Sequence, residues 1–90
     1  MINERKLYES AVIQWGRNSQ LAMVQEECAE LIAAISHLRR RNSLEELLGE
    51  IADVEIMLGQ LRIMFGDADI DAIKKAKLER LAQRLEGAEQ

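Results

Sequence analysis

Two acidic clusters stand out in this sequence, and each lies in a segment whose apolar residues recur at helical spacing. The first cluster is Glu26, Glu27 and Glu30, and the second is Glu50 and Asp53. Residues three apart lie on one face of a helix, so each cluster can direct two carboxylates at one point. Carboxylates held this close repel one another, and a divalent cation that prefers oxygen ligands is the usual compensation. The spacing therefore predicts a site for Mg²⁺, with Mn²⁺ as an alternative.

The two clusters are in phase with the apolar residues around them. Superposing residues 24–31 on residues 47–54 places acid on acid and apolar residue on apolar residue. If the two helices pack antiparallel, both carboxylate pairs can converge across the contact. Glu27 and Glu50 each precede an apolar position by one residue, which places them at the edge of the expected core, whereas Glu26 faces away from it. The alternative is that all these acids belong to the solvated face of amphipathic helices.

Helical periodicity and capping residues predict four helices and no strands. The expected helices cover residues 3–15, 21–42, 43–66 and 67–87, with residues 16–19 as a break and Asp67 or Asp69 as the start of the last helix. Ser43 and Glu46 have the Ser-x-x-Glu spacing of a capping box. The second and third helices are expected to pack through apolar residues spaced by three and four: Leu21, Val24, Cys28, Leu31, Ile35 and Leu38, then Leu44, Leu47, Ile51, Val54, Leu58 and Leu61.

Length and composition narrow the class of protein. Ninety residues suit one domain, residues 1–90, with a thin core, so a homodimer or homotetramer is expected. The net charge of -4 argues against general binding of nucleic acid. No apolar run is long enough to span a membrane and no signal peptide is evident, so no membrane partner is expected and a cytoplasmic location is predicted.

The acidic motifs resemble those of a known family. Glu26-Glu27-Cys28-Ala29-Glu30 and Glu50-Ile51-Ala52-Asp53 look like the E-E-x-x-E and E-x-x-D pair of the MazG-like nucleotide pyrophosphohydrolases, part of the all-α NTP pyrophosphatase superfamily. The resemblance covers approximately residues 12–85 and includes Lys77-Leu78-Glu79-Arg80-Leu81. It implies an all-α fold, a four-helix MazG-like bundle completed by oligomerisation.

The resemblance also implies an activity, which is magnesium-dependent hydrolysis of a nucleoside triphosphate (NTP or dNTP) to the monophosphate and pyrophosphate. By motif position, the implied metal ligands are Glu27, Glu30, Glu50 and Asp53, and the implied catalytic residues are Glu26, Lys77 and Arg80. The sequence departs from longer members at Lys75, where those often carry asparagine. Two other functions fit the same residues: a phosphoribosyl-ATP pyrophosphohydrolase, or a non-catalytic helical oligomerisation module.

Other side chains have two interpretations each. Arg40 and Lys74 can bind phosphate groups or belong to a solvated charged face. Trp15 can stack on a nucleobase or fill the core. Glu55 is either a carboxylate at a subunit interface or an additional ligand at the acidic site. The single histidine, His37, is expected at the surface.

Overall fold

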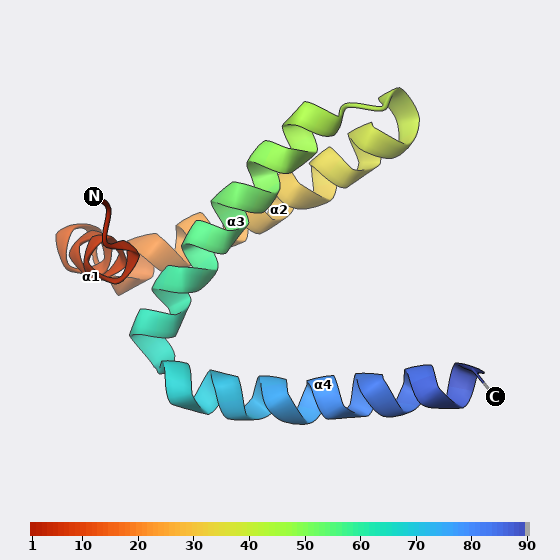
Figure 1. The fold of residues 1–90 in the computed structure, drawn as a ribbon. Helices are drawn as coiled ribbons and strands as arrows, with labels where there is room; N and C mark the ends of the chain where they lie inside the picture. The colour runs from red at the N-terminus through yellow and green to blue at the C-terminus, as the bar shows by residue number, and fades with distance from the viewer. Residues whose placement is uncertain (90) are drawn as a thin grey trace.

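The computed structural model describes residues 1–89 and contains four α-helices (Figure 1). These are α1 (Glu4–Trp15), α2 (Arg17–Arg41), α3 (Leu44–Phe65) and α4 (Asp67–Glu89). Within the described residues there is no strand, so the prediction of an all-α chain with four helices is confirmed. No helix in this part of the chain is both long and apolar enough to cross a membrane.

Local side chains explain where the first two helices begin and end. Asn3 caps α1, because its side chain accepts a hydrogen bond of 3.1 Å from the Lys6 N–H. The expected break over residues 16–19 is wrong, since helical structure resumes at Arg17. Gly16 alone turns the chain, at a φ of 87° that glycine adopts without strain. Asn42 ends α2 in the left-handed region, at a φ of 57°.

The start of α3 differs from the expected capping box. Ser43 does occupy the position before the helix, but within the described residues its side chain makes no capping hydrogen bond. Glu46 instead accepts a hydrogen bond from the ring of His37 on α2, with 2.9 Å between Oε1 and Nδ1. This contact joins the two helices near their connection. At the other end of the chain, α4 continues past Gly87, where it was expected to fade.

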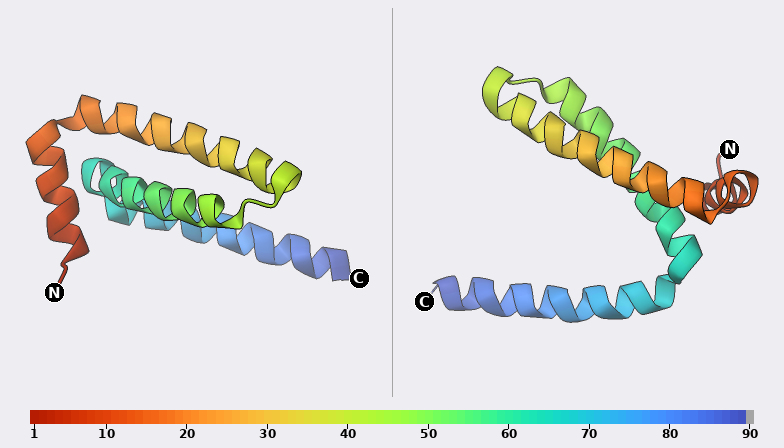
Figure 2. Two further views of the ribbon diagram at one scale, coloured as in Figure 1. Left: turned by 90° about the horizontal axis from the view of Figure 1, so that it is seen from above. Right: turned by 180° about the vertical axis from the view of Figure 1, so that it is seen from behind.

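Helices α2 and α3 lie side by side as an antiparallel hairpin joined by Asn42–Ser43 (Figures 1 and 2). Their contact positions alternate by three and four residues, but they are shifted from the expected set. Ile51 and Leu58 were expected in the contact and are 40% and 46% exposed. The buried or half-buried residues with this spacing are Gln20, Val24, Glu27, Leu31, Ala34 and Leu38 on α2 and Leu47, Glu50, Val54, Met57 and Leu61 on α3. Leu21 and Cys28, which were expected in the contact, are also half-buried.

Helix α1 crosses the open end of this hairpin (Figure 2). Its Tyr8 ring lies on Gly59 of α3, so close that a methyl group at Gly59 would come within 2.7 Å of Tyr8 Cδ2. Beneath α1, the Gln20 side-chain amide donates a hydrogen bond of 2.6 Å to Gln60 Oε1, and both glutamines are buried. The lack of a side chain at Gly59 therefore allows α1 to approach α3 closely.

Helix α4 diverges from the hairpin (Figure 1). Its backbone approaches the end of α3 that leads into it, across Gly66, which has a φ of 105°. Arg62 donates hydrogen bonds to Asp67 at 3.1 Å and to Asp71 at 2.7 Å, and Arg5 donates another to Asp67 at 3.0 Å. These contacts fix the elbow between α3 and α4. A single chain therefore does not enclose α4 in a four-helix bundle.

Candidate metal centre

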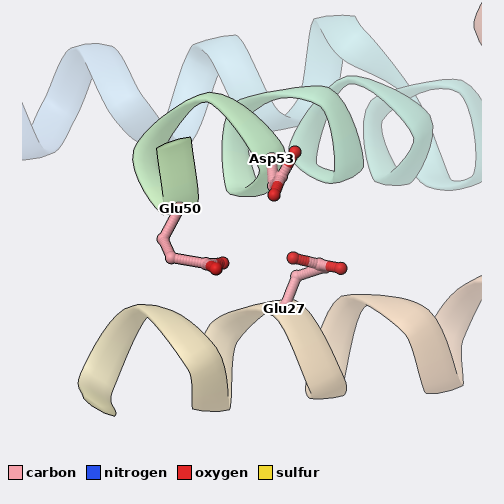
Figure 3. A group of neighbouring side chains, drawn as sticks. All are labelled: Glu27, Glu50 and Asp53. Atoms are coloured by element: carbon pink, nitrogen blue, oxygen red, sulfur yellow. The ribbon is translucent and has the colours of Figure 1, made fainter. Parts of the chain in front are cut away.

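Three carboxylates from the two hairpin helices converge between them. Glu27 projects from α2 toward Glu50 and Asp53 of α3 (Figure 3). One oxygen from each of the three side chains lies within 4.8 Å of the others. The two helices bring these acids together because Glu27 and Glu50 occupy contact positions of the hairpin, whereas Asp53 lies on the exposed side of the contact.

Each of the two contact carboxylates has one oxygen that is shielded from solvent. Glu27 and Glu50 are half-buried, and the Oε2 atom of each is shielded from solvent. Among the described residues, neither of these oxygens has a hydrogen-bond partner. A buried carboxylate oxygen without a donor is unusual, because its lost hydration is normally replaced by hydrogen bonds or by a cation.

The pKa values of these two carboxyl groups also favour a cation between the helices. Burial of the Glu27 carboxyl raises its pKa above the ordinary value of 4.5, and the charge of Glu30 adds to this increase, followed by those of Asp53 and Glu50. Burial likewise raises the pKa of Glu50, and Glu30 and Asp53 raise it further. Glu30 thus acts on both contact carboxylates from its exposed position on α2, although it lies outside the group of three. A positive charge between the helices would reverse these shifts.

The donor set fits one class of ligand. Carboxylate oxygens, without a histidine or cysteine among them, suit a hard divalent cation such as Mg²⁺ or Mn²⁺. Cys28, next to Glu27 in the chain, is a free thiol outside the group. The exposed side formed by Asp53 and Glu30 leaves the site accessible to a ligand from solvent.

The other predicted site residues lie elsewhere. Glu26 is exposed on α2, in agreement with the prediction that it faces away from the hairpin contact. Lys77 and Arg80 are exposed on α4, which diverges from the hairpin, so one chain does not bring them to the acidic cluster (Figure 1). Lys74 lines a groove of about 620 Å³ between α1, α3 and the start of α4, which also contains Glu55.

Two further predicted residues lie at the ends of the hairpin. Arg40 is exposed near the end of α2, where it borders a shallow depression with Ser36 and Arg39. Trp15 is 62% exposed at the end of α1, so within one chain it does not fill the core. Its ring borders apolar grooves at the junction of α1 with the hairpin.

Sequence reasoning missed the buried pair Gln20 and Gln60. A signal was present, because Gln20 precedes Glu27 by seven residues and Gln60 follows Asp53 by seven. Seven residues are close to two helical turns, so each glutamine lies on the same face as the acid. The pair is a second polar layer of the hairpin, two turns from the carboxylates.

Comparison with known protein families, curated proteins and solved structures found no match to this chain.

Proposed function

We propose that this protein is a magnesium-dependent nucleoside triphosphate pyrophosphohydrolase, which cleaves an NTP or dNTP to the monophosphate and pyrophosphate. One observation carries the proposal: the Oε2 atoms of Glu27 and Glu50 are shielded from solvent within a cluster of acids, and no donor among the described residues reaches them. A divalent cation satisfies both oxygens at once. The resemblance of the two acidic motifs to those of MazG-like enzymes supplies the reaction.

The openness of the site favours a catalytic role over a purely structural one. Mg²⁺ in phosphate-transfer enzymes is held by few carboxylates and keeps positions for water and substrate phosphate. Here Glu27 and Glu50 form the enclosed side of the cluster, while Asp53 and Glu30 form the exposed side. A triphosphate can therefore approach from solvent toward the cluster without displacing a helix.

The protein's own residues would have distinct tasks. Glu27, Glu50 and Asp53 would hold the cation, with Glu30 as the fourth predicted ligand. When bound, Mg²⁺ supplies neutralisation of phosphate charge and acidification of a water molecule. The catalytic roles of Glu26, Lys77 and Arg80 stay predictions, as do the substrate contacts of Trp15, Arg40 and Lys74, and the proposal does not depend on them. Assembly as a homodimer or homotetramer is part of the proposal.

A substrate panel tests the activity. The purified chain is incubated with the common ribonucleotides and deoxyribonucleotides and with phosphoribosyl-ATP, and pyrophosphate is measured with and without Mg²⁺. We expect equal amounts of monophosphate and pyrophosphate, formed only with Mg²⁺. Glu27→Gln should reduce the rate by about a hundredfold or more, because even outer-shell partners of a metal contribute 10–100-fold. Glu26→Gln, the matched change one residue away, should reduce it much less.

Each negative result has a defined meaning. Magnesium binding without pyrophosphate release from any compound would refute the hydrolase and favour the non-catalytic module. Hydrolysis of phosphoribosyl-ATP alone would identify the alternative enzyme. Equal rates for Glu27→Gln and the unmodified protein would refute the assignment of the acidic cluster as the active site.

A further inference from the structure

An uncharged groove lies where the end of α1 meets the hairpin. Its volume is about 590 Å³, within the usual range for pockets that bind small organic molecules. Every described residue that lines it is uncharged. Its lining includes Trp15 from α1, Gln20 and Met23 from α2, and Met57 and Gln60 from α3. The groove therefore suits an uncharged, largely apolar part of a ligand.

The glutamine pair in this groove, Gln20 and Gln60, is not satisfied by its own hydrogen bond. The two side chains are only 4% and 5% exposed, and Gln20 Nε2 donates to Gln60 Oε1. Among the described residues, Gln20 Oε1 accepts no hydrogen bond, and Gln60 Nε2 donates only to the sulfur of Met57, a weak acceptor, at 3.7 Å. Buried amides normally have partners. One acceptor and one donor are therefore left for a ligand.

The groove and the acidic cluster lie on the same face of the hairpin. Met23 precedes Glu27 by four residues on α2, and Met57 follows Asp53 by four on α3. Residues with this spacing share one face of a helix. At a rise of 1.5 Å per residue, the two methionines lie about 6 Å along the hairpin from the acids, and the glutamine pair about 10 Å. The nucleoside of a nucleotide whose phosphates lie at the acids can reach the groove.

A nucleobase matches the groove in shape and in chemistry. Its flat aromatic faces can contact the Trp15 ring and the thioethers of Met23 and Met57. Its edge carries hydrogen-bond donors and acceptors side by side, and the free oxygen and nitrogen of the glutamine pair can meet both kinds. A phosphate chain does not match, because an anion in an uncharged groove loses hydration without gaining a cation.

We propose that the base of the nucleotide binds in this groove, with its edge hydrogen-bonded to Gln20 Oε1 and Gln60 Nε2. This inference rests on the proposed function and names the side chains that select the base. Met23 and Met57 would contact its faces. Compounds with a triphosphate but no base should therefore bind at the acids without filling the groove.

The methyl groups of the methionines report where the base binds. The chain contains four methionines. Met23 and Met57 line the groove, whereas Met1 and Met64 do not and serve as internal controls. Protein with ¹³C-labelled methionine methyls and saturating Mg²⁺ is titrated with α,β-methylene analogues of the common nucleoside triphosphates, which resist cleavage, and with tripolyphosphate, which has no base.

The ring current of a bound base should shift the Met23 and Met57 signals with at least one analogue. Tripolyphosphate should shift them much less. Equal shifts with tripolyphosphate, shifts confined to Met1 and Met64, or no binding of any analogue would overturn the proposal.

Substitution of Gln60 separates recognition of the base from support of the fold. Gln60→Met removes the donor and should weaken the best-bound analogue by about tenfold. Calorimetry should show the same affinity for tripolyphosphate as in the unmodified protein. A glutamine pair that only joins the two helices would instead leave both affinities unchanged or weaken both equally, and either result would overturn the assignment.

A milder variant covers the case in which Gln60→Met does not fold. Met23 is 39% exposed, so Met23→Ala should leave the fold intact. It should weaken the analogue by about fourfold or more, since it removes apolar contact with the base, and should leave tripolyphosphate binding unchanged. Ile32→Ala is the matched control, because nine residues place Ile32 on the opposite side of α2, and it should change neither affinity.

Pyrophosphate release is measured separately, so the groove and the hydrolase can fail independently. If the analogues shift Met23 and Met57 but no nucleotide is cleaved, the hydrolase is refuted and the base site stands. Cleavage without these shifts would overturn the base site and leave the hydrolase standing. Unchanged affinity for the analogues in Met23→Ala would also overturn the base site.

Discussion

Replacing Glu27 by glutamine should remove the stabilisation of this protein by Mg²⁺ and should also stabilise the metal-free form. The substitution keeps the shape of the side chain but removes a charge held beside Glu30, Glu50 and Asp53, where neighbouring carboxylates and burial disfavour it. The same charge is what a cation needs at this position. The metal-free and metal-bound states should therefore respond in opposite directions to one substitution.

The size of the magnesium effect follows from mass action. Above the dissociation constant, each tenfold increase in free Mg²⁺ stabilises a protein that binds it only when folded by about 1.4 kcal/mol. In a domain of 60–100 residues, 1 kcal/mol shifts Tm by roughly 4–8 °C. One occupied site in this chain should thus raise Tm by about 5–11 °C per tenfold increase in Mg²⁺. The variant should show a slope near zero.

The assay is a series of thermal melts followed by circular dichroism. Protein stripped of metal with a chelator is titrated with magnesium chloride, and a parallel series with sodium chloride at equal ionic strength corrects for screening of the acidic surface. Glu26→Gln provides the matched control. It removes the same charge from the neighbouring residue, whose side chain is exposed. It should retain the magnesium slope of the unmodified protein.

Three outcomes would refute the reasoning. If sodium chloride raised Tm as much as magnesium chloride at equal ionic strength, the acids would be a screened surface and not a binding site. If Glu27→Gln kept the magnesium slope, Glu27 would not be a ligand. A metal-free variant markedly less stable than the unmodified protein would show that the Glu27 carboxylate makes a stabilising contact, contrary to its unpartnered Oε2.

Three further predictions concern the acids, the α1–α3 contact and the bond that is cleaved. The pKa values of Glu27 and Glu50 are raised from 4.5, so above this pH the metal-free native state binds more protons than the unfolded state. Tm should therefore fall as pH rises from 4.5 through the raised pKa values. A Tm that rises over this range would contradict the prediction. The Tm of Gly59→Ala should be at least about 4 °C below that of Gly49→Ala. Both substitutions gain helix propensity, but only the methyl group at residue 59 meets the Tyr8 ring, at a cost of about 1–3 kcal/mol. Equal Tm values would refute the close packing. Hydrolysis in oxygen-18 water should label the monophosphate and not pyrophosphate, whereas labelled orthophosphate would indicate attack at the γ phosphorus.

Local signals in the sequence were sufficient to predict that there are four helices and which acids converge. Capping by Asn3, the left-handed Asn42 and the positive-φ Gly66 set three helix boundaries, and each is a property of the residue itself. The convergence of Glu27, Glu50 and Asp53 followed from their three-residue spacing in two neighbouring helices. Spacing alone did not distinguish Glu30 from these three, because Glu30 also lies three residues from Glu27.

The rotation of α3 was not predictable, because α3 is apolar on two faces. Ile51 and Leu58 have the same spacing as Leu47 and Val54, so periodicity permits either set to contact α2. The structure selects the second set, which leaves the first exposed. The direction of α4 was also hidden, since it depends on the single residue Gly66 and on the contacts of Arg62.

This rotation changes the physical interpretation of the acidic site. Glu27 and Glu50 were expected at the edge of the hairpin contact, but they lie within it, at positions that apolar residues occupy elsewhere along α2 and α3. Acids there weaken the metal-free hairpin, because their burial and mutual repulsion oppose packing of the two helices. A cation between them would convert that repulsion into attraction to a shared charge, so metal binding would be coupled to helix packing. The acids of the proposed site therefore lower the stability of the hairpin where they lie, a trade-off that is common at active sites.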